Sequence, residues 1–171
     1  MVPKGMIRAL LFVAVAGLTA SMTGCKTTPQ PHARANAGST VRLEHVGLNV
    51  VDPNKAAQWY VENLGMKVVR QSPAPVNARF LADSGGNMML EIYHNPPEAV
   101  PNYASMDPLL LHVAFMVDDV DAARQKLIAA GATPVGEATT TPAGDKLAML
   151  RDPWGLAIQF VRRADPMLRF R

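Results

Sequence analysis

The feature that most constrains this chain is a phrase of eight residues that occurs twice. Residues 45–52 (HVGLNVVD) return as residues 112–119 (HVAFMVDD). Each copy is followed by a helical pattern that ends at a glycine, Gly65 in the first copy and Gly131 in the second. Repetition of this kind indicates two similar structural units that follow one another along the chain.

Each copy predicts a module with the order strand, helix and then three strands. The first strand is expected over residues 41–51 and its counterpart over 109–117. His45 and Gly47 share one face of the first strand, and the other face is uniformly apolar from Val46 onward. The apolar face predicts a covering helix. Asp52 and Pro53 have the residue types preferred at a helix start. The expected buried stripes are Ala57, Tyr60, Val61 and Leu64 in the first helix and Val120, Ala123, Leu127 and Ala130 in the second.

The remaining strands are predicted from short β-branched or apolar runs between turn residues. They are expected over residues 67–71, 77–83 and 88–93 in the first module and 133–137, 146–151 and 156–161 in the second. The proline-rich stretch 95–108 is the expected connection. The domain therefore covers residues 41–163, with modules at 41–94 and 109–163, followed by a short tail at 164–171.

Four polar residues stand at equivalent places in these otherwise apolar strands. Glu91 interrupts the last strand of the first module and Gln159 that of the second, at nearly the same distance after His45 and His112. Polar groups in such strands are costly unless they have partners. Because the two modules are pseudo-symmetric, the four side chains are expected to meet at one point. Two imidazoles, one carboxylate and one amide oxygen suit a divalent metal ion with open positions.

Each of these residues also has a simpler interpretation. A histidine in a strand is often a hydrogen-bonded core residue, and Glu91 could pair with an arginine such as Arg79. The repeated placement favours the metal site.

The composition indicates a packed globule and gives no support to nucleic-acid binding. Hydrophobic residues make up 49% of the 171 residues and charged residues 18%, with a net charge of +3. Two of the basic residues, Lys4 and Arg8, lie in a segment expected to be removed, and no basic stripe remains.

The first 40 residues are predicted to export and anchor the domain. Basic residues precede a short apolar run at 9–18, as in a signal peptide. Residues 22–25 (MTGC) resemble a bacterial lipoprotein cleavage box, which implies that residues 1–24 are removed and that Cys25 is lipidated. Residues 25–40 are then a tether, and the expected location is extracytoplasmic, on the outer membrane facing the periplasm in a Gram-negative cell.

Residues 41–163 resemble the vicinal oxygen chelate superfamily, which includes glyoxalase I, methylmalonyl-CoA epimerase, extradiol dioxygenases and the bleomycin and fosfomycin resistance proteins. The motifs that carry the resemblance are His45 with residues 59–60 (WY) and 64–66 (LGM), 90–93 (LEIY), 111–114 (LHVA) and 152–155 (DPWG) before Gln159. The resemblance implies an α+β fold in which two βαβββ modules form a cup-shaped mixed sheet with the helices outside.

The resemblance also implies a metal site and a reaction class. The metal ligands would be His45, Glu91, His112 and Gln159, and the ion Zn, Ni, Fe or Mn. The fourth ligand is usually a glutamate that also moves a proton; an amide cannot act as a base, so Glu91 is the expected catalytic residue. Tyr93 and Trp154 are expected either to line a substrate pocket or to pack in the core.

Three functions agree with this pattern. The first is a glyoxalase-like or epimerase-like enzyme that chelates two vicinal oxygens of a small substrate on the metal. The second is a small-molecule binding module without chemistry, as in the resistance proteins, which Gln159 favours. The third is an iron-dependent dioxygenase. The modules either close on each other within one chain or swap between the chains of a homodimer, and the sequence leaves both arrangements open.

Overall fold

The computed structural model describes residues 42–95 and 99–167. The chain divides into two units, residues 1–40 and 41–171. The predicted signal peptide, lipidated Cys25 and tether all lie outside the described residues. In the described ranges no helix is both long and apolar enough to cross a membrane.

The first module has the predicted order of elements. Strand β1 (His45–Asn49) leads into helix α1 (Pro53–Leu64), and strands β2 (Lys67–Gln71), β3 (Arg79–Ala82) and β4 (Met89–Tyr93) follow. They form a sheet in the order β1-β4-β3-β2, in which β1 is parallel to β4 and the other pairs are antiparallel. Asp52 caps α1 by accepting a hydrogen bond from the backbone N–H of Lys55.

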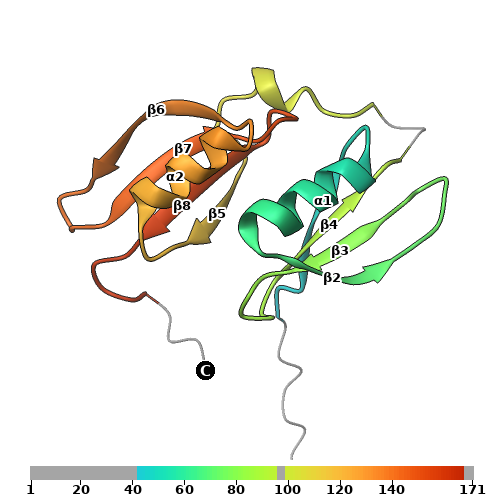
Figure 1. The fold of residues 1–171 in the computed structure, drawn as a ribbon, viewed down its shortest axis with the longest axis horizontal. Helices are drawn as coiled ribbons and strands as arrows, with labels where there is room; N and C mark the ends of the chain where they lie inside the picture. Colours follow the sequence, from blue (N-terminus) through green and yellow to red (C-terminus); the bar gives the residue numbers. More distant parts are fainter. Residues whose placement is uncertain (1–41, 96–98, 168–171) are drawn as a thin grey trace, which may run out of the picture. The chain divides into compact units, whose positions relative to one another are not determined.

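The second module repeats this topology. It consists of strand β5 (His112–Met116), helix α2 (Val120–Ala129) and strands β6 (Thr133–Thr140), β7 (Lys146–Arg151) and β8 (Ala157–Arg162). The sheet order is β5-β8-β7-β6, with β5 parallel to β8. A short 3₁₀ helix, η1 (Tyr103–Ser105), lies in the connection between the modules and was not predicted. Figure 1 shows the two modules with their strands and helices labelled.

The α+β class and the two βαβββ modules are confirmed. Each module has its own four-stranded mixed sheet, in which β1 pairs only with β4 and β5 only with β8. Both are therefore edge strands with one unpaired side within the described residues.

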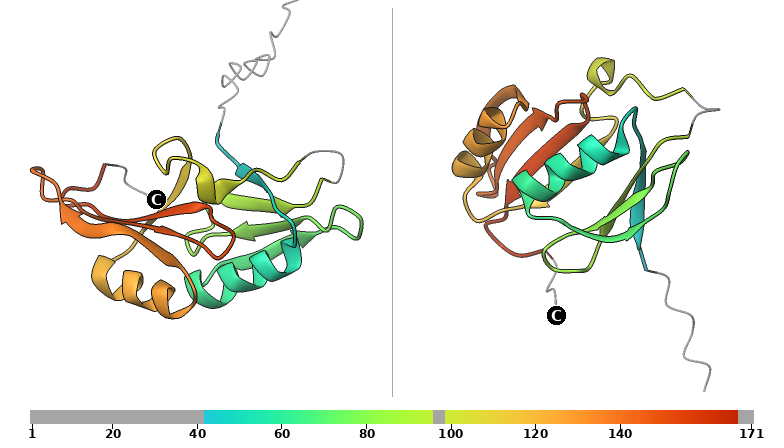
Figure 2. Two further views of the ribbon diagram at one scale, coloured as in Figure 1. Left: turned by 90° about the horizontal axis from the view of Figure 1, so that it is seen from above. Right: turned by 45° about the vertical axis from the view of Figure 1, so that its right-hand side comes forward.

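Each helix covers one face of its own sheet, as Figure 2 shows. The residues beneath it form the core, including Leu48, Leu81 and Ile92 in the first module and Leu150 and Ile158 in the second. Of the predicted helix stripes, Ala57, Tyr60, Val120 and Leu127 are buried. We call the opposite face of each sheet its open face.

The buried contact between the modules is partly polar. The Tyr60 hydroxyl donates to the Asp152 carboxylate at 2.9 Å, and the Trp59 indole N–H donates to the Ala130 carbonyl at 2.8 Å. Burial raises the pKa of Asp152, while its hydrogen bond from Tyr60 lowers it. Trp154 meets Trp59 edge-to-face with ring centroids 6.2 Å apart, so Trp154 packs between the modules.

Two predicted strands begin later than expected. The ladder of β1 starts at His45 because it runs only alongside β4, from His45 opposite Met89. Before β5, the side chain of Asp107 accepts a hydrogen bond from the backbone N–H of Leu109. The backbone carbonyl of Asp107 accepts another from the N–H of Leu110. These bonds make a turn of residues that the sequence pattern had assigned to the strand.

Candidate metal centre

His45 and Glu91 come together on the open face of the first module. His45 lies on β1, and Glu91 lies opposite Gly47 on the neighbouring strand β4. The Nε2 atom of His45 is 3.3 Å from the Oε2 atom of Glu91. Both side chains remain partly accessible, with 37% of the His45 side chain and 24% of the Glu91 side chain exposed. A small molecule can therefore reach the pair.

Gly47 and two aromatic rings surround this pair. A Cβ atom added to Gly47 would lie 3.2 Å from the Cε1 atom of Tyr93 and 3.7 Å from Oε2 of Glu91. Glycine at this position thus allows both side chains to occupy the face next to β1. Phe80, opposite Glu91 on β3, meets the His45 ring edge-to-face at 5.6 Å. Tyr93 and Phe80 form the aromatic surroundings of the pair.

The second nitrogen of His45 is engaged by a carboxylate. Its Nδ1 atom forms a short contact with Glu44, a residue that sequence reasoning missed. Hydrogen bonding to Glu44 raises the pKa of His45, and the charges of Glu44 and Glu91 act in the same direction. Because a carboxylate only accepts, Nδ1 carries a proton. In the neutral ring, the lone pair of Nε2 would then face the oxygen of Glu91, and only a proton or a cation between them satisfies both atoms.

His112 and Gln159 occupy the same positions in the second module. His112 lies on β5, and Gln159 is opposite Ala114 on β8, just as Glu91 is opposite Gly47. The Nδ1 atom of His112 is 2.9 Å from the Pro108 carbonyl oxygen. A carbonyl also only accepts, so His112 is protonated at Nδ1 and leaves Nε2 available.

Both histidines therefore present the nitrogen that a metal ion would use. Histidine ligands in metal sites generally donate their other ring N–H to a carboxylate or a backbone carbonyl, which fixes the orientation of the ring. Glu44 and Pro108 are in those places here. The donor set of two imidazoles, one carboxylate and one amide oxygen fits a divalent cation.

The single chain does not bring these groups together into one cluster. Among the residues that the structure describes, no group of three or more His, Cys, Asp or Glu side chains is placed to hold a metal ion. His45 and Glu91 form one pair, and His112 and Gln159 stand on the equivalent strands of the other module. We call these two pairs the half-sites.

Comparison with known proteins agrees with this geometry. A model of the Glyoxalase/Bleomycin resistance protein/Dioxygenase superfamily matches residues 42–160. The chain belongs to this superfamily. The lactoylglutathione lyase of Neisseria meningitidis serogroup A is 30% identical over 129 residues, which cover 72% of this chain and 91% of that protein. The lactoylglutathione lyase of Haemophilus influenzae is 28% identical over 125 residues, covering 71% and 92%. The crystal structure of SMU.1112c is 33% identical, with a TM-score of 0.57, and covers 71% of this chain and 98% of that one.

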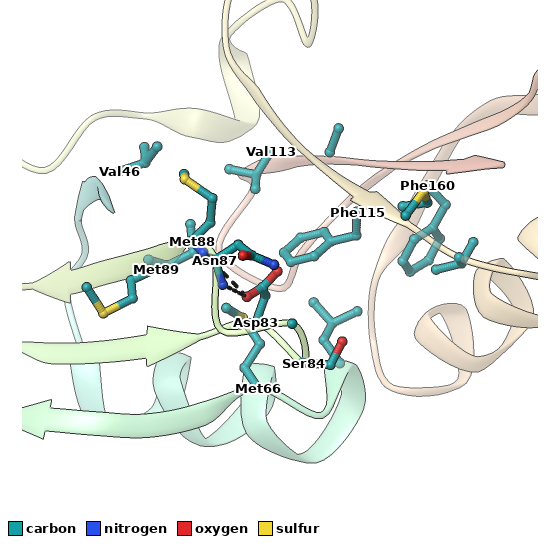
Figure 3. A pocket seen from close by; sticks show the side chains of 16 residues that line it. Val46, Met66, Asp83, Ser84, Asn87, Met88, Met89, Val113, Phe115 and Phe160 are labelled. Carbon is teal, nitrogen blue, oxygen red and sulfur yellow. Dashed lines mark hydrogen bonds between the residues drawn. The ribbon is translucent and has the colours of Figure 1, made fainter. Parts of the chain in front are cut away.

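This member of the superfamily also has an apolar cavity of about 460 Å³ between its two modules. Figure 3 shows Val46, Met88 and Met89 from the first module near Val113 and Phe115 of β5. None of the four predicted ligands lines this cavity. Sequence reasoning did not find it, because its walls combine residues of both modules, mostly apolar with Asp83, Ser84 and Asn87, that meet only in the folded chain.

The other predicted site residues also have defined places. Tyr93 is on the open face beside Gly47. Arg79 stands on the face of the sheet that α1 covers, opposite Ile92. There it donates to the carbonyls of Ser72, Asn77 and Ala78, and it does not pair with Glu91. Glu91 therefore keeps its carboxylate free for the open face.

Proposed function

We propose that this protein is a metal-dependent lyase or isomerase of the glyoxalase type, acting on a small substrate with two vicinal oxygens. His45, Glu91, His112 and Gln159 would hold the ion, and divalent metals are typical of the superfamily. Bound there, the ion would act as a Lewis acid on the two substrate oxygens. We further propose that lipid on Cys25 holds the domain on the extracytoplasmic side of a membrane.

The observation that carries the proposal is the arrangement of the two histidines. Each has Nδ1 against an oxygen acceptor, and the free Nε2 of His45 lies 3.3 Å from the Glu91 carboxylate. Two acceptors at that separation need a proton or a cation between them, and a metal ion bound there would fill this place. The Nδ1 atom of His112 likewise faces an oxygen acceptor, the Pro108 carbonyl in place of the Glu44 carboxylate. This similarity supports a shared role for the two imidazole rings.

We infer that a second copy of the chain completes the site. Each half-site lies on an edge strand, and an edge strand has unpaired N–H and C=O groups that can pair with another chain. Large apolar side chains are exposed next to both edges: Leu43 is 68% exposed before β1 and Leu110 77% before β5. Pairing β1 with β5 of the partner subunit would cover these leucines and place His45 and Glu91 beside His112 of the partner subunit.

The protein's own residues divide the chemistry between them. Glu91 is the only carboxylate among the four ligands, so it is the group that takes a proton from one substrate carbon and returns it to the next. Gln159 can bind through its oxygen but cannot exchange a proton. Gly47 allows the side chains of Glu91 and Tyr93 to occupy the face next to β1, and Phe80 packs edge-to-face against the His45 ring.

Metal analysis of the purified full-length protein tests the proposal. We expect one divalent ion per chain and loss of that ion in His45→Ala and in His112→Ala. Glu91→Gln should lose turnover of a vicinal dicarbonyl adduct while its fold, measured by circular dichroism, stays intact. A protein that binds no divalent ion with micromolar or better affinity would contradict the proposal.

Co-expression of two inactive variants tests whether the site is shared between chains. A dimer of one His45→Ala chain and one His112→Ala chain contains one site with both histidines intact only if each site uses both chains. Since about half of the dimers formed at random are mixed, about one quarter of the wild-type metal content should return. No recovery would contradict the shared site and leave the two modules of one chain to form it.

A non-catalytic binding protein is the second candidate, and the apolar cavity favours it. Its volume of about 460 Å³ is within the range of small-molecule pockets. If this candidate is correct, apolar ligands bind the metal-free protein, Phe115→Ala weakens them at least about tenfold, and Glu91→Gln has no effect.

A further inference from the structure

The open face of the first module contains one row of residues that runs across all four strands. Gly47 is opposite Glu91, Glu91 is opposite Phe80, and Phe80 is opposite Arg70. Paired residues on neighbouring strands share a face of the sheet. Arg70 therefore stands on the same face as the His45–Glu91 pair, two strands away from Glu91 and on the far side of Phe80.

Arg70 reaches this face because of a bulge in β2. Val68 is opposite Leu81, but the next pair along the ladder is Arg70 with Phe80, so Val69 is the extra residue. Without the bulge, Val69 would take the place opposite Phe80 and Arg70 would stand opposite Arg79, on the face that α1 covers. Bulges are frequent beside functional sites, where they redirect a side chain. Here the bulge replaces a valine by an arginine on the open face.

The guanidinium of Arg70 has no partner within the described part of the chain. Arg70 is exposed, and it takes part in none of the hydrogen bonds or ion pairs found in residues 42–95 and 99–167. Two other arginines of the sheets are used structurally: Arg79 and Arg151 each donate to several backbone carbonyls. Arg70 thus offers a planar pair of N–H donors at the edge of the row.

We propose that Arg70 is a specificity-determining residue that binds a carboxylate on the substrate, at the end away from the chelated oxygens. This inference rests on the proposed function, because it assumes that the vicinal oxygens are held at the His45–Glu91 pair. Strand spacing places the Cα atoms of Arg70 and Glu91 roughly 10 Å apart. A flat substrate lying over Phe80 spans that distance, with its oxygens at one end and its carboxylate at the other. Guanidinium and carboxylate match in a bidentate geometry that an ammonium group does not reproduce.

Two probes of equal shape separate the carboxylate from the rest of the ligand. The probes are 3,4-dihydroxybenzoate and its neutral amide, 3,4-dihydroxybenzamide, titrated by calorimetry into the full-length protein loaded with zinc at neutral pH. Both offer the same vicinal oxygens. We expect the benzoate to bind about tenfold more tightly than the amide. In Arg70→Gln the affinity for the benzoate should fall to that for the amide, and the affinity for the amide should not change. In Arg70→Lys the benzoate should keep only part of its advantage over the amide.

Lys67 supplies the matched control. It is on the same strand and the same open face, opposite Ala82, and it is also exposed. Lys67→Gln removes the same charge but should leave the preference for the benzoate unchanged. If Lys67→Gln removes the preference and Arg70→Gln does not, the assignment to Arg70 is wrong.

The remaining outcomes separate this inference from the proposed function. Equal binding of both probes, with loss of both in His45→Ala, would overturn the role of Arg70 and leave chelation intact. Failure of both probes to bind the zinc-loaded protein would overturn chelation and the carboxylate anchor together.

Discussion

Replacing Gly155 by alanine should be among the most destabilising single-methyl changes in this protein. Gly155 is the last residue of the turn before β8, has φ of +92°, and is buried. A Cβ atom there would be 2.6 Å from the backbone N of Ala104, 2.7 Å from its Cβ and 2.8 Å from its Cα. Real Cβ atoms do not approach other atoms so closely, and two of these three atoms are backbone. Either the turn or η1 must therefore move.

Two terms contribute to the loss of stability. A side chain at positive φ costs about 1–2 kcal/mol, and forcing a methyl group into a packed contact costs about 1–3 kcal/mol more. We therefore expect Gly155→Ala to lower the free energy of unfolding by about 2–5 kcal/mol. Gly136→Ala isolates the first term, because Gly136 has φ of +71° and a Cβ there meets no heavy atom within 4 Å.

Urea denaturation of both variants, followed by circular dichroism, gives the comparison. The difference between them measures how firmly η1 packs against the 152–155 turn. Ala104→Gly in the Gly155→Ala background should recover only part of the loss, since the clashes with the backbone N and Cα of residue 104 remain. Equal costs for Gly155→Ala and Gly136→Ala would refute the reasoning and show that the connection between the modules yields easily.

Three further changes test other parts of the structure. Tyr60→Phe removes the hydrogen bond to Asp152 and should cost about 1–3 kcal/mol. Burial raises the pKa of Asp152 above its unfolded value, so the stability from this group is complete below the unfolded pKa and is lost as the pH rises through the folded pKa. Because the Tyr60 bond lowers that pKa, the variant should lose more stability at about pH 7 than at about pH 4; equal losses at both would contradict this. Gly47→Val should weaken zinc binding at least about tenfold with little change in unfolding free energy, because its side chain would crowd Glu91 and Tyr93; unchanged zinc affinity would show that the space is not used. Cys25→Ser should move the protein from the membrane fraction to the soluble fraction, as judged by immunoblotting, if lipid on Cys25 anchors it.

The features that the sequence predicted correctly depend on local signals. Asp52 caps the first helix, accepting a hydrogen bond from the backbone N–H of Lys55. Gly65 ends α1 in the left-handed conformation, with φ of +68°. The alternation in the repeated phrase placed His45 and His112 opposite the apolar face, and the core residues confirm that face. Each of these inferences needed only a few neighbouring residues.

What the sequence did not reveal depends on partners far along the chain or on backbone atoms. The Pro108 carbonyl that orients His112 belongs to a turn and has no signature in the residue type. The bulge that puts Arg70 opposite Phe80 depends on the register between β2 and β3. Because Val68 and Val69 are identical, the sequence does not specify which of them is the extra residue. The separation of the half-sites likewise depends on how the sheets pair, and no spacing within one chain determines that.

The two modules share a topology but differ in the row that crosses the open face. In the first module this row reads Gly47, Glu91, Phe80 and Arg70; in the second, the equivalent positions are Ala114, Gln159, Met149 and Val135. The first row has a carboxylate, an aromatic ring and a cation, whereas the second has an amide and apolar side chains. A site built from one row of each kind is asymmetric, with proton transfer and charge recognition on one side and an apolar wall on the other. If the proposed function is correct, such a site would accept an elongated substrate in a single orientation, and one glutamate would serve where a symmetric site would have two.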